Sequence, residues 1–152
     1  MKSALIFFML CFGIMQGLQA QVVEKSSLDV DDIEILVKDV LFTGKKDTVI
    51  VELFLNSYKK NPREFKLNTF ATGIIGVDGT PLFYSTIQLE KVFVDIKDRQ
   101  NYIHYLLKGD VPVLLRIATV GWQKRWGKPQ QLKLTFEDST EEGKFLDVLV
   151  DL

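Results

Sequence analysis

Hydrophobic and polar residues alternate along most of the chain beyond residue 30. The clearest alternating runs, with hydrophobic residues at every second position, are 49–55, 111–117, 132–136 and 146–152. Shorter runs of the same kind are 65–72, 82–89, 92–96 and 102–107. Successive side chains of an extended strand point to opposite faces, so this period of two predicts strands that each bury one face.

Turn-forming residues separate these runs and leave little room for a long helix. Asp78-Gly79 lies between two short hydrophobic runs and is a strong hairpin signal, because glycine tolerates positive φ. Further turns are marked by Asn61-Pro62, Lys108-Gly109-Asp110 and Glu142-Gly143. About eight short strands at this spacing predict an all-β fold, an antiparallel β-sandwich.

The segment 31–43 fits two patterns. As a helix it would gather hydrophobic side chains on one face, namely Ile33, Leu36, Val37, Val40 and Leu41. As a strand it would point Ile33, Ile35 and Val37 inward, and its phase would slip at Lys38-Asp39, as a β-bulge allows. The β-branched residues favour the strand.

The first twenty residues have the pattern of a cleaved secretory signal peptide. Lys2 is the only charge among them, a hydrophobic run covers 4–15, and Ala20 is a small residue suited to a cleavage site. This run is shorter than the roughly 20 residues that a membrane-spanning helix needs. A retained N-terminal anchor and a lipid anchor on Cys11 are the alternatives.

These patterns divide the chain into three parts. We expect a signal peptide at 1–20, a flexible lead-in at 21–30 and a single β-sandwich domain at 31–152. The expected location is secreted or periplasmic, without a transmembrane span in the mature chain. Cysteine is absent after residue 20 and no Asn-x-Ser/Thr sequon occurs, which favours a bacterial origin.

Composition narrows the possible chemistry. Nineteen Lys and Arg residues balance 20 Asp and Glu residues, so the net charge of −1 gives no basic footprint for nucleic acid. One His and one Cys are too few for a zinc site, and the mature chain has no thiol for a disulfide or a nucleophile. We therefore expect neither a bound metal nor a cofactor.

The most distinctive candidate for binding is the stretch 121–128. It contains both tryptophans with three basic residues, and the candidate binding residues in it are Trp122, Lys124, Arg125, Trp126 and Lys128. Exposed Trp can stack on sugar rings or anchor a protein interface, and basic residues among aromatics also suit a membrane surface. Alternatively, at least one Trp covers the open end of the core.

Three weaker candidates lie outside this stretch. Phe83 and Tyr84 must point to opposite sides of a strand, and we include Tyr84 among the candidate binding residues. His104 is the only side chain whose unperturbed pKa lies near neutrality, which makes it the candidate base of a small hydrolase. The carboxylates near residue 30 could bind calcium, but their spacing is not that of an EF-hand loop.

The order of these segments resembles exported immunoglobulin-like sandwiches, including telokin-like bacterial domains. The similarity lies in the run Ile33–Phe42, the strand at 49–55 ending in Asn56, Val77-Asp78-Gly79, and Lys108-Gly109-Asp110-Val111 before a later strand. The resemblance implies an immunoglobulin-like β-sandwich and a non-enzymatic role in adhesion, assembly or the envelope. It assigns no functional residue, and the Cys…Trp…Cys signature of immunoglobulins is missing.

We therefore expect an exported, non-enzymatic binding or structural module of the cell envelope or extracellular space. Its partner would be a protein or an envelope component contacted through loops. A carbohydrate-binding module that uses exposed Trp is one alternative, and a small hydrolase that uses His104 is another. Self-assembly through open strand edges is also compatible with the fold.

Overall fold

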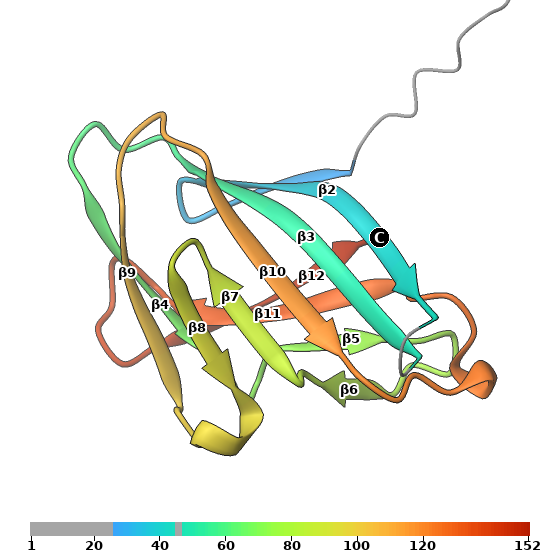
Figure 1. The fold of residues 1–152 in the computed structure, drawn as a ribbon. Coiled ribbons are helices and arrows are strands. Elements are labelled where there is room, and N and C mark those ends of the chain that lie inside the picture. Colours follow the sequence, from blue (N-terminus) through green and yellow to red (C-terminus); the bar gives the residue numbers. More distant parts are fainter. Residues whose placement is uncertain (1–25, 45–46) are drawn as a thin grey trace, which may run out of the picture.

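The protein folds into two layers of antiparallel β-sheet (Figure 1). The computed structural model describes residues 26–44 and 47–152. The first sheet contains, in spatial order, β1 (Ser27–Val30), β2 (Ile33–Thr43), β3 (Thr48–Ser57), β10 (Val113–Thr119), β7 (Thr86–Leu89) and β8 (Val92–Asp95). The second contains, in spatial order, β6 (Pro81–Phe83), β5 (Gly73–Ile75), β11 (Gln131–Glu137), β4 (Arg63–Asn68) and β9 (Tyr102–Leu107), with β12 (Phe145–Asp151) paired to β11. The predicted all-β antiparallel fold is confirmed.

The described residues form twelve strands, more than the predicted eight, because several alternating runs are divided. The run 82–89 splits into β6 in the second sheet and β7 in the first, where the chain crosses between the layers. Two short 3₁₀ helices, η1 (Ile96–Asp98) and η2 (Lys124–Trp126), lie in connections. The hairpin predicted at Asp78-Gly79 joins β5 to β6.

The ambiguous segment 31–43 is a strand, and its predicted bulge is present. The pairing of β2 with β3 shifts between Val37 and Asp39, so Lys38 and Asp39 together lie across from Glu52. After the bulge, Val40 lies opposite the buried Val51, and Phe42 lies opposite the buried Val49. The bulge therefore returns the hydrophobic positions of β2 to the inner face.

The lead-in predicted at 21–30 is wrong for its last four residues. Residues 27–30 form β1, which pairs with the start of β2 through a two-residue turn at Asp31-Asp32. Leu28 and Val30 pack against the core, which explains why this segment is ordered as a strand. The predicted signal peptide at 1–20 lies outside the described residues. In the described part of the chain, no helix has the length and apolar character needed to cross a bilayer.

The core lies between the two sheets and is built from their inward-pointing positions. Val51, Leu53, Leu115 and Ile117 from the first sheet are fully buried. Leu67, Ile103, Leu132 and Leu134 from the second sheet are fully buried against them. Burial of this apolar surface holds the sandwich together, because residues 26–152 contain no cysteine for a disulfide.

Candidate binding groove at the loop end

Three connections meet at one end of the sandwich, which we call the loop end (Figure 1). They are the two described sides of the β2–β3 connection at Gly44 and Asp47, the β5–β6 turn, and residues 120–130, which include η2. The Trp122 amide donates to the Asp47 carbonyl at 2.8 Å, and the Val77 amide donates to the Trp126 carbonyl at 3.0 Å. These bonds fix residues 120–130 against both neighbouring connections.

Trp122 closes the core at the loop end. Its side chain belongs to the buried cluster, and the residue is only 7% exposed. The indole Nε1 donates to the Gly127 carbonyl at 2.8 Å, which satisfies its one polar group. This is the covering role that we considered as the alternative to binding for one of the two tryptophans.

Trp126 lies between the core and the solvent. Its ring meets that of Trp122 edge to face, with centroids 5.5 Å apart, and the Arg125 guanidinium lies 5.5 Å from its centroid. Trp126 also packs closely on Gly76, where a Cβ would come within 2.6 Å of the Trp126 carbonyl oxygen. Sugar stacking requires an open aromatic face, which Trp122 lacks. The carbohydrate alternative therefore depends on Trp126 alone.

A groove of about 490 Å³ lies between residues 42–44 and Asp47 on one side and residues 122–128 on the other. Its lining includes Phe42, Asp47, Trp122, Lys124 and Lys128. The two aromatic rings supply apolar surface, and the aliphatic stems of the lysines can extend it while their ammonium groups reach the water. The structure thus brings three of the predicted binding residues, Trp122, Lys124 and Lys128, to a single groove.

Phe42 and Asp47 are groove residues that sequence reasoning missed, and Phe42 is the more exposed aromatic. The position of Phe42 opposite Val49 puts it on the inner face of β2, yet the residue is 57% exposed. The alternating pattern correctly gives the face of Phe42, but it cannot show that the second sheet fails to cover the end of β2. The sequence feature that could have indicated its exposure is its position at the end of the hydrophobic run, two residues before the turn at Gly44.

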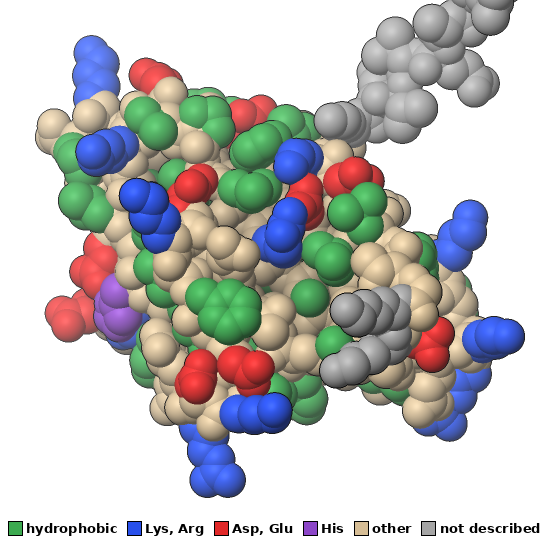
Figure 2. All heavy atoms as spheres, viewed as in Figure 1, with side chains coloured by type: hydrophobic (Ala, Val, Ile, Leu, Met, Phe, Trp, Pro, Cys, Tyr) green, Lys and Arg blue, Asp and Glu red, His purple; other side chains and the backbone are tan. Residues whose placement is uncertain are grey.

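The loop end carries several basic side chains. Lys124, Arg125 and Lys128 are all exposed, and Figure 2 shows Lys and Arg side chains projecting from the end of the molecule that carries η2. Asp47 is the one carboxylate among the described lining residues of the groove, and it lies on the β2–β3 side. No ion pair joins Lys124 or Lys128 to another described residue.

Tyr84 does not belong to an accessible surface. The residue is 1% exposed, and its hydroxyl is buried without a hydrogen-bond partner among the described residues. Phe83, its neighbour, points outward instead. The two residues do point to opposite sides, as expected, but the inclusion of Tyr84 among the binding residues needs correction, because the crossing between sheets turns its ring into the core.

His104 lies on the outer face of β9, away from the groove. Its Nδ1 is 2.6 Å from Oε1 of Glu64 on the neighbouring strand β4, and both side chains are exposed. A Ser-type hydrolase needs a hydroxyl nucleophile hydrogen-bonded to the base. Among the described residues, the only side-chain hydrogen bond of His104 is the one to Glu64.

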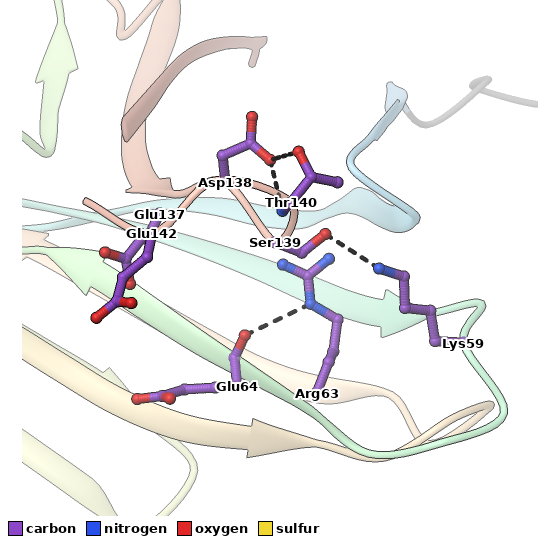
Figure 3. A pocket seen from close by; sticks show the side chains of 8 residues that line it. All are labelled: Lys59, Arg63, Glu64, Glu137, Asp138, Ser139, Thr140 and Glu142. Carbon is purple, nitrogen blue, oxygen red and sulfur yellow. Dashed lines mark hydrogen bonds between the residues drawn. The ribbon is translucent and has the colours of Figure 1, made fainter. Parts of the chain in front are cut away.

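A polar cleft of about 400 Å³ lies at the opposite end of the sandwich (Figure 3). Lys59, Arg63 and the loop after β11 line it, and Lys59 points toward Ser139 with its Nζ 3.0 Å from the hydroxyl. Glu137 accepts from Lys66 at 3.1 Å and from the Gly143 amide at 2.7 Å. Most charged groups of this cleft therefore have an ion partner, which in each case is a residue outside the lining.

Asp31 links three distant parts of the chain at the same end. Its carboxylate accepts from Arg63 at 2.8 Å, and from the hydroxyl and amide of Ser139 at 2.6 and 3.0 Å. Arg63 also donates to the Asp31 carbonyl. Burial disfavours the ionised carboxylate, but the hydrogen bonds from Ser139 and Arg63 outweigh it and hold the pKa of Asp31 below its usual value. We call Asp31, Arg63 and Ser139 the clasp.

The other carboxylates near residue 30 also contact protein groups. Asp29 accepts from the Tyr58 hydroxyl at 3.1 Å, and Asp32 lies 3.5 Å from the Lys59 ammonium. A search of residues 26–44 and 47–152 finds no group of three His, Cys, Asp or Glu side chains that could hold a metal ion. The contacts of Asp29 and Asp32 tie the β1–β2 turn to the residues that follow β3.

Comparison with known proteins adds no family to this picture. The chain matches no protein-family model, and a search of curated proteins finds no significant match. The geometry of the groove is therefore the basis for assigning a function.

Proposed function

We propose that this chain is an exported, non-enzymatic binding module that contacts its partner through the loop end. The partner would be a protein or another component of the cell envelope or extracellular space. The proposal includes cleavage of residues 1–20 and the finer assignment of the sandwich to immunoglobulin-like, telokin-like domains.

The observation that carries the proposal is the groove, with an exposed aromatic ring beside lysines that have no described ion partner. Ligand sites are concave and mostly apolar, with a few charged groups that give orientation. Phe42 supplies the exposed ring, and Lys124 and Lys128 supply the charges. The polar cleft at the other end fits this role less well, because most of its charged groups already have an ion partner elsewhere in the protein.

The matched pair Phe42→Ser and Phe93→Ser tests this proposal. Phe42 and Phe93 are 57% and 59% exposed, but Phe93 lies on β8, outside the loop end. Each mature variant would be used to capture partners from the native envelope, and the affinity of any purified partner would then be measured. We expect Phe42→Ser to lose the partner while Phe93→Ser keeps it.

Two results would contradict the proposal. Equal retention of the partner by both variants would exclude the groove as the contact surface. Recovery of the full-length chain from the cytoplasm, with residues 1–20 still attached, would exclude export. Urea unfolding of both variants guards against misfolding, because loss of a well-exposed ring should change the free energy of unfolding by no more than about 0.5 kcal/mol.

A further inference from the structure

The floor and one wall of the groove are apolar for a topological reason. The bulge in β2 directs Phe42 to the inner side of the first sheet, where it lies beyond the part that the second sheet covers. Trp122 closes the core beside it, with its single polar atom already bonded to Gly127. The aromatic surfaces therefore offer contact area without a free hydrogen-bonding group.

The charge of the groove differs from that of the sheet faces. On the outer faces, lysines and arginines are matched to carboxylates at 4 Å or less, as in Lys38–Glu52, Lys66–Glu137 and Lys133–Asp147. Lys124 and Lys128 both line the groove, and neither has such a carboxylate partner among the described residues. Two ammonium groups against the single Asp47 carboxylate leave these lining residues with a charge of +1.

We propose that the groove binds a small apolar anion, that is, a molecule with a hydrocarbon body and one carboxylate group. The body would lie chiefly on the exposed Phe42 ring, with Trp122 lining the groove beside it, and the carboxylate would pair with Lys124 and Lys128. This inference rests on the proposed function and names the class of ligand for the same groove. The groove volume of about 490 Å³ lies within the range of about 300–1,000 Å³ that small-molecule sites occupy.

The aromatic surface and the charge of the groove suit a sugar or a cation less well than an apolar anion. A sugar would need several hydrogen bonds along its hydroxyls, whereas the Phe42 ring has no polar atom and the one polar atom of the Trp122 side chain is already bonded to Gly127. A cation would meet two ammonium groups for one carboxylate. Charge complementarity therefore selects an anion, and the exposed ring selects one with an apolar body.

The test compares two probes with the same chain and opposite charge, decanoate and decylammonium, below their aggregation concentrations. Calorimetric titration of the mature protein at low salt should show decanoate binding about tenfold more tightly. Lys124→Gln/Lys128→Gln should abolish this preference, whereas Lys91→Gln/Lys108→Gln, at exposed lysines away from the groove, should keep it. Phe42→Ser should weaken both probes, and Phe93→Ser neither.

The outcomes separate this inference from the proposed function. Equal affinity for the two probes, a preference that survives Lys124→Gln/Lys128→Gln, or no binding at all would overturn the anion site. If Phe42→Ser still lost the envelope partner in any of these cases, the proposed function would stand and only the ligand class would be wrong. If decanoate bound as expected but Phe42→Ser kept the partner, the anion site would stand and the partner surface would be wrong.

Discussion

Asp31 and Asp32 occupy the two central positions of the β1–β2 turn, and both have positive φ, of 51° and 57°. Two-residue hairpin turns with this geometry match the twist of antiparallel strands, but they strain most residues other than Gly, Asn and Asp. The two side chains differ sharply. The Asp31 side chain is held by Arg63 and Ser139, whereas the Asp32 side chain makes, among the described residues, one long and exposed contact to Lys59.

The same substitution at these neighbours should therefore have different effects. We expect Asp31→Gly to lower the free energy of unfolding by about 3–5 kcal/mol, because the Arg63 side chain, 6% exposed, would keep its charge without a carboxylate. We expect Asp32→Gly to be neutral or stabilising by up to about 1 kcal/mol, because glycine suits positive φ. Urea unfolding measures both, and equal losses would show that the backbone conformation, and not the clasp, determines stability here.

At the scale of single residues, the sequence predicted correctly to which face of a strand a side chain points. It did not predict whether the other sheet covers that face. The alternating pattern gave the inward direction of Phe42 and the opposite directions of Phe83 and Tyr84. It could not give exposure, because exposure depends on whether a strand of the other sheet lies above the position. The clasp was also beyond prediction, since Asp31 and Ser139 are 108 residues apart and no local pattern couples them.

At the scale of elements, the bulge in β2 serves both the core and the outer face. It places Lys38 and Asp39 together across from Glu52, which is also bonded to Arg116 on β10 at 2.8 Å through its Nε. Hydrogen bonds from Lys38 and Arg116 hold the pKa of Glu52 below its usual value although burial opposes this. The phase slip in the sequence predicted the bulge, but the pattern of one strand could not reveal its ionic partners on two others.

Two single-residue deletions separate the roles of the bulge. Deleting either Lys38 or Asp39 restores regular pairing with β3 and keeps the inward phase of the flanking residues. Deleting Asp39 leaves Lys38 opposite Glu52, whereas deleting Lys38 leaves two carboxylates opposite each other. We expect the Lys38 deletion to be less stable than the Asp39 deletion by about 1–3 kcal/mol, as measured by urea unfolding.

The test is which of the two deletion variants has the lower free energy of unfolding. If the Asp39 deletion were the less stable of the two, the charge pairing with Glu52 would not be what the bulge provides. Far-ultraviolet circular dichroism should remain that of a strand-rich protein in both variants, which confirms that the comparison is between folded chains.

At the scale of the whole molecule, one apolar core joins two differently built ends. Trp122 closes the loop end, and the clasp ties the turns at the other end. The sequence predicted two pleated layers around a core without disulfides, and the structure has that arrangement. Which loops share an end follows from strand order, which the alternating pattern alone does not determine.

The two ends should contribute to stability independently. Ser139→Ala removes a hydrogen bond to Asp31, and Trp122→Phe removes the one to the Gly127 carbonyl. We expect each to lower the free energy of unfolding by about 1–2 kcal/mol, and the double variant to show their sum within about 0.5 kcal/mol. Urea unfolding of all four proteins forms the cycle, and a larger coupling would show that the ends communicate through the core.

The clasp also constrains the order in which the protein can fold. The Asp31 carboxylate in the β1–β2 turn accepts hydrogen bonds from Arg63 and Ser139. The β1–β2 hairpin therefore cannot make all of these bonds until the chain has been synthesised as far as Ser139. The last strand, β12, must then add to the edge of β11. Contacts of such long sequence separation close slowly, on the millisecond-to-second scale typical of β-sandwiches. We therefore expect a chain that lacks residues from Ser139 onward to leave the β1–β2 turn without one of its two anchors.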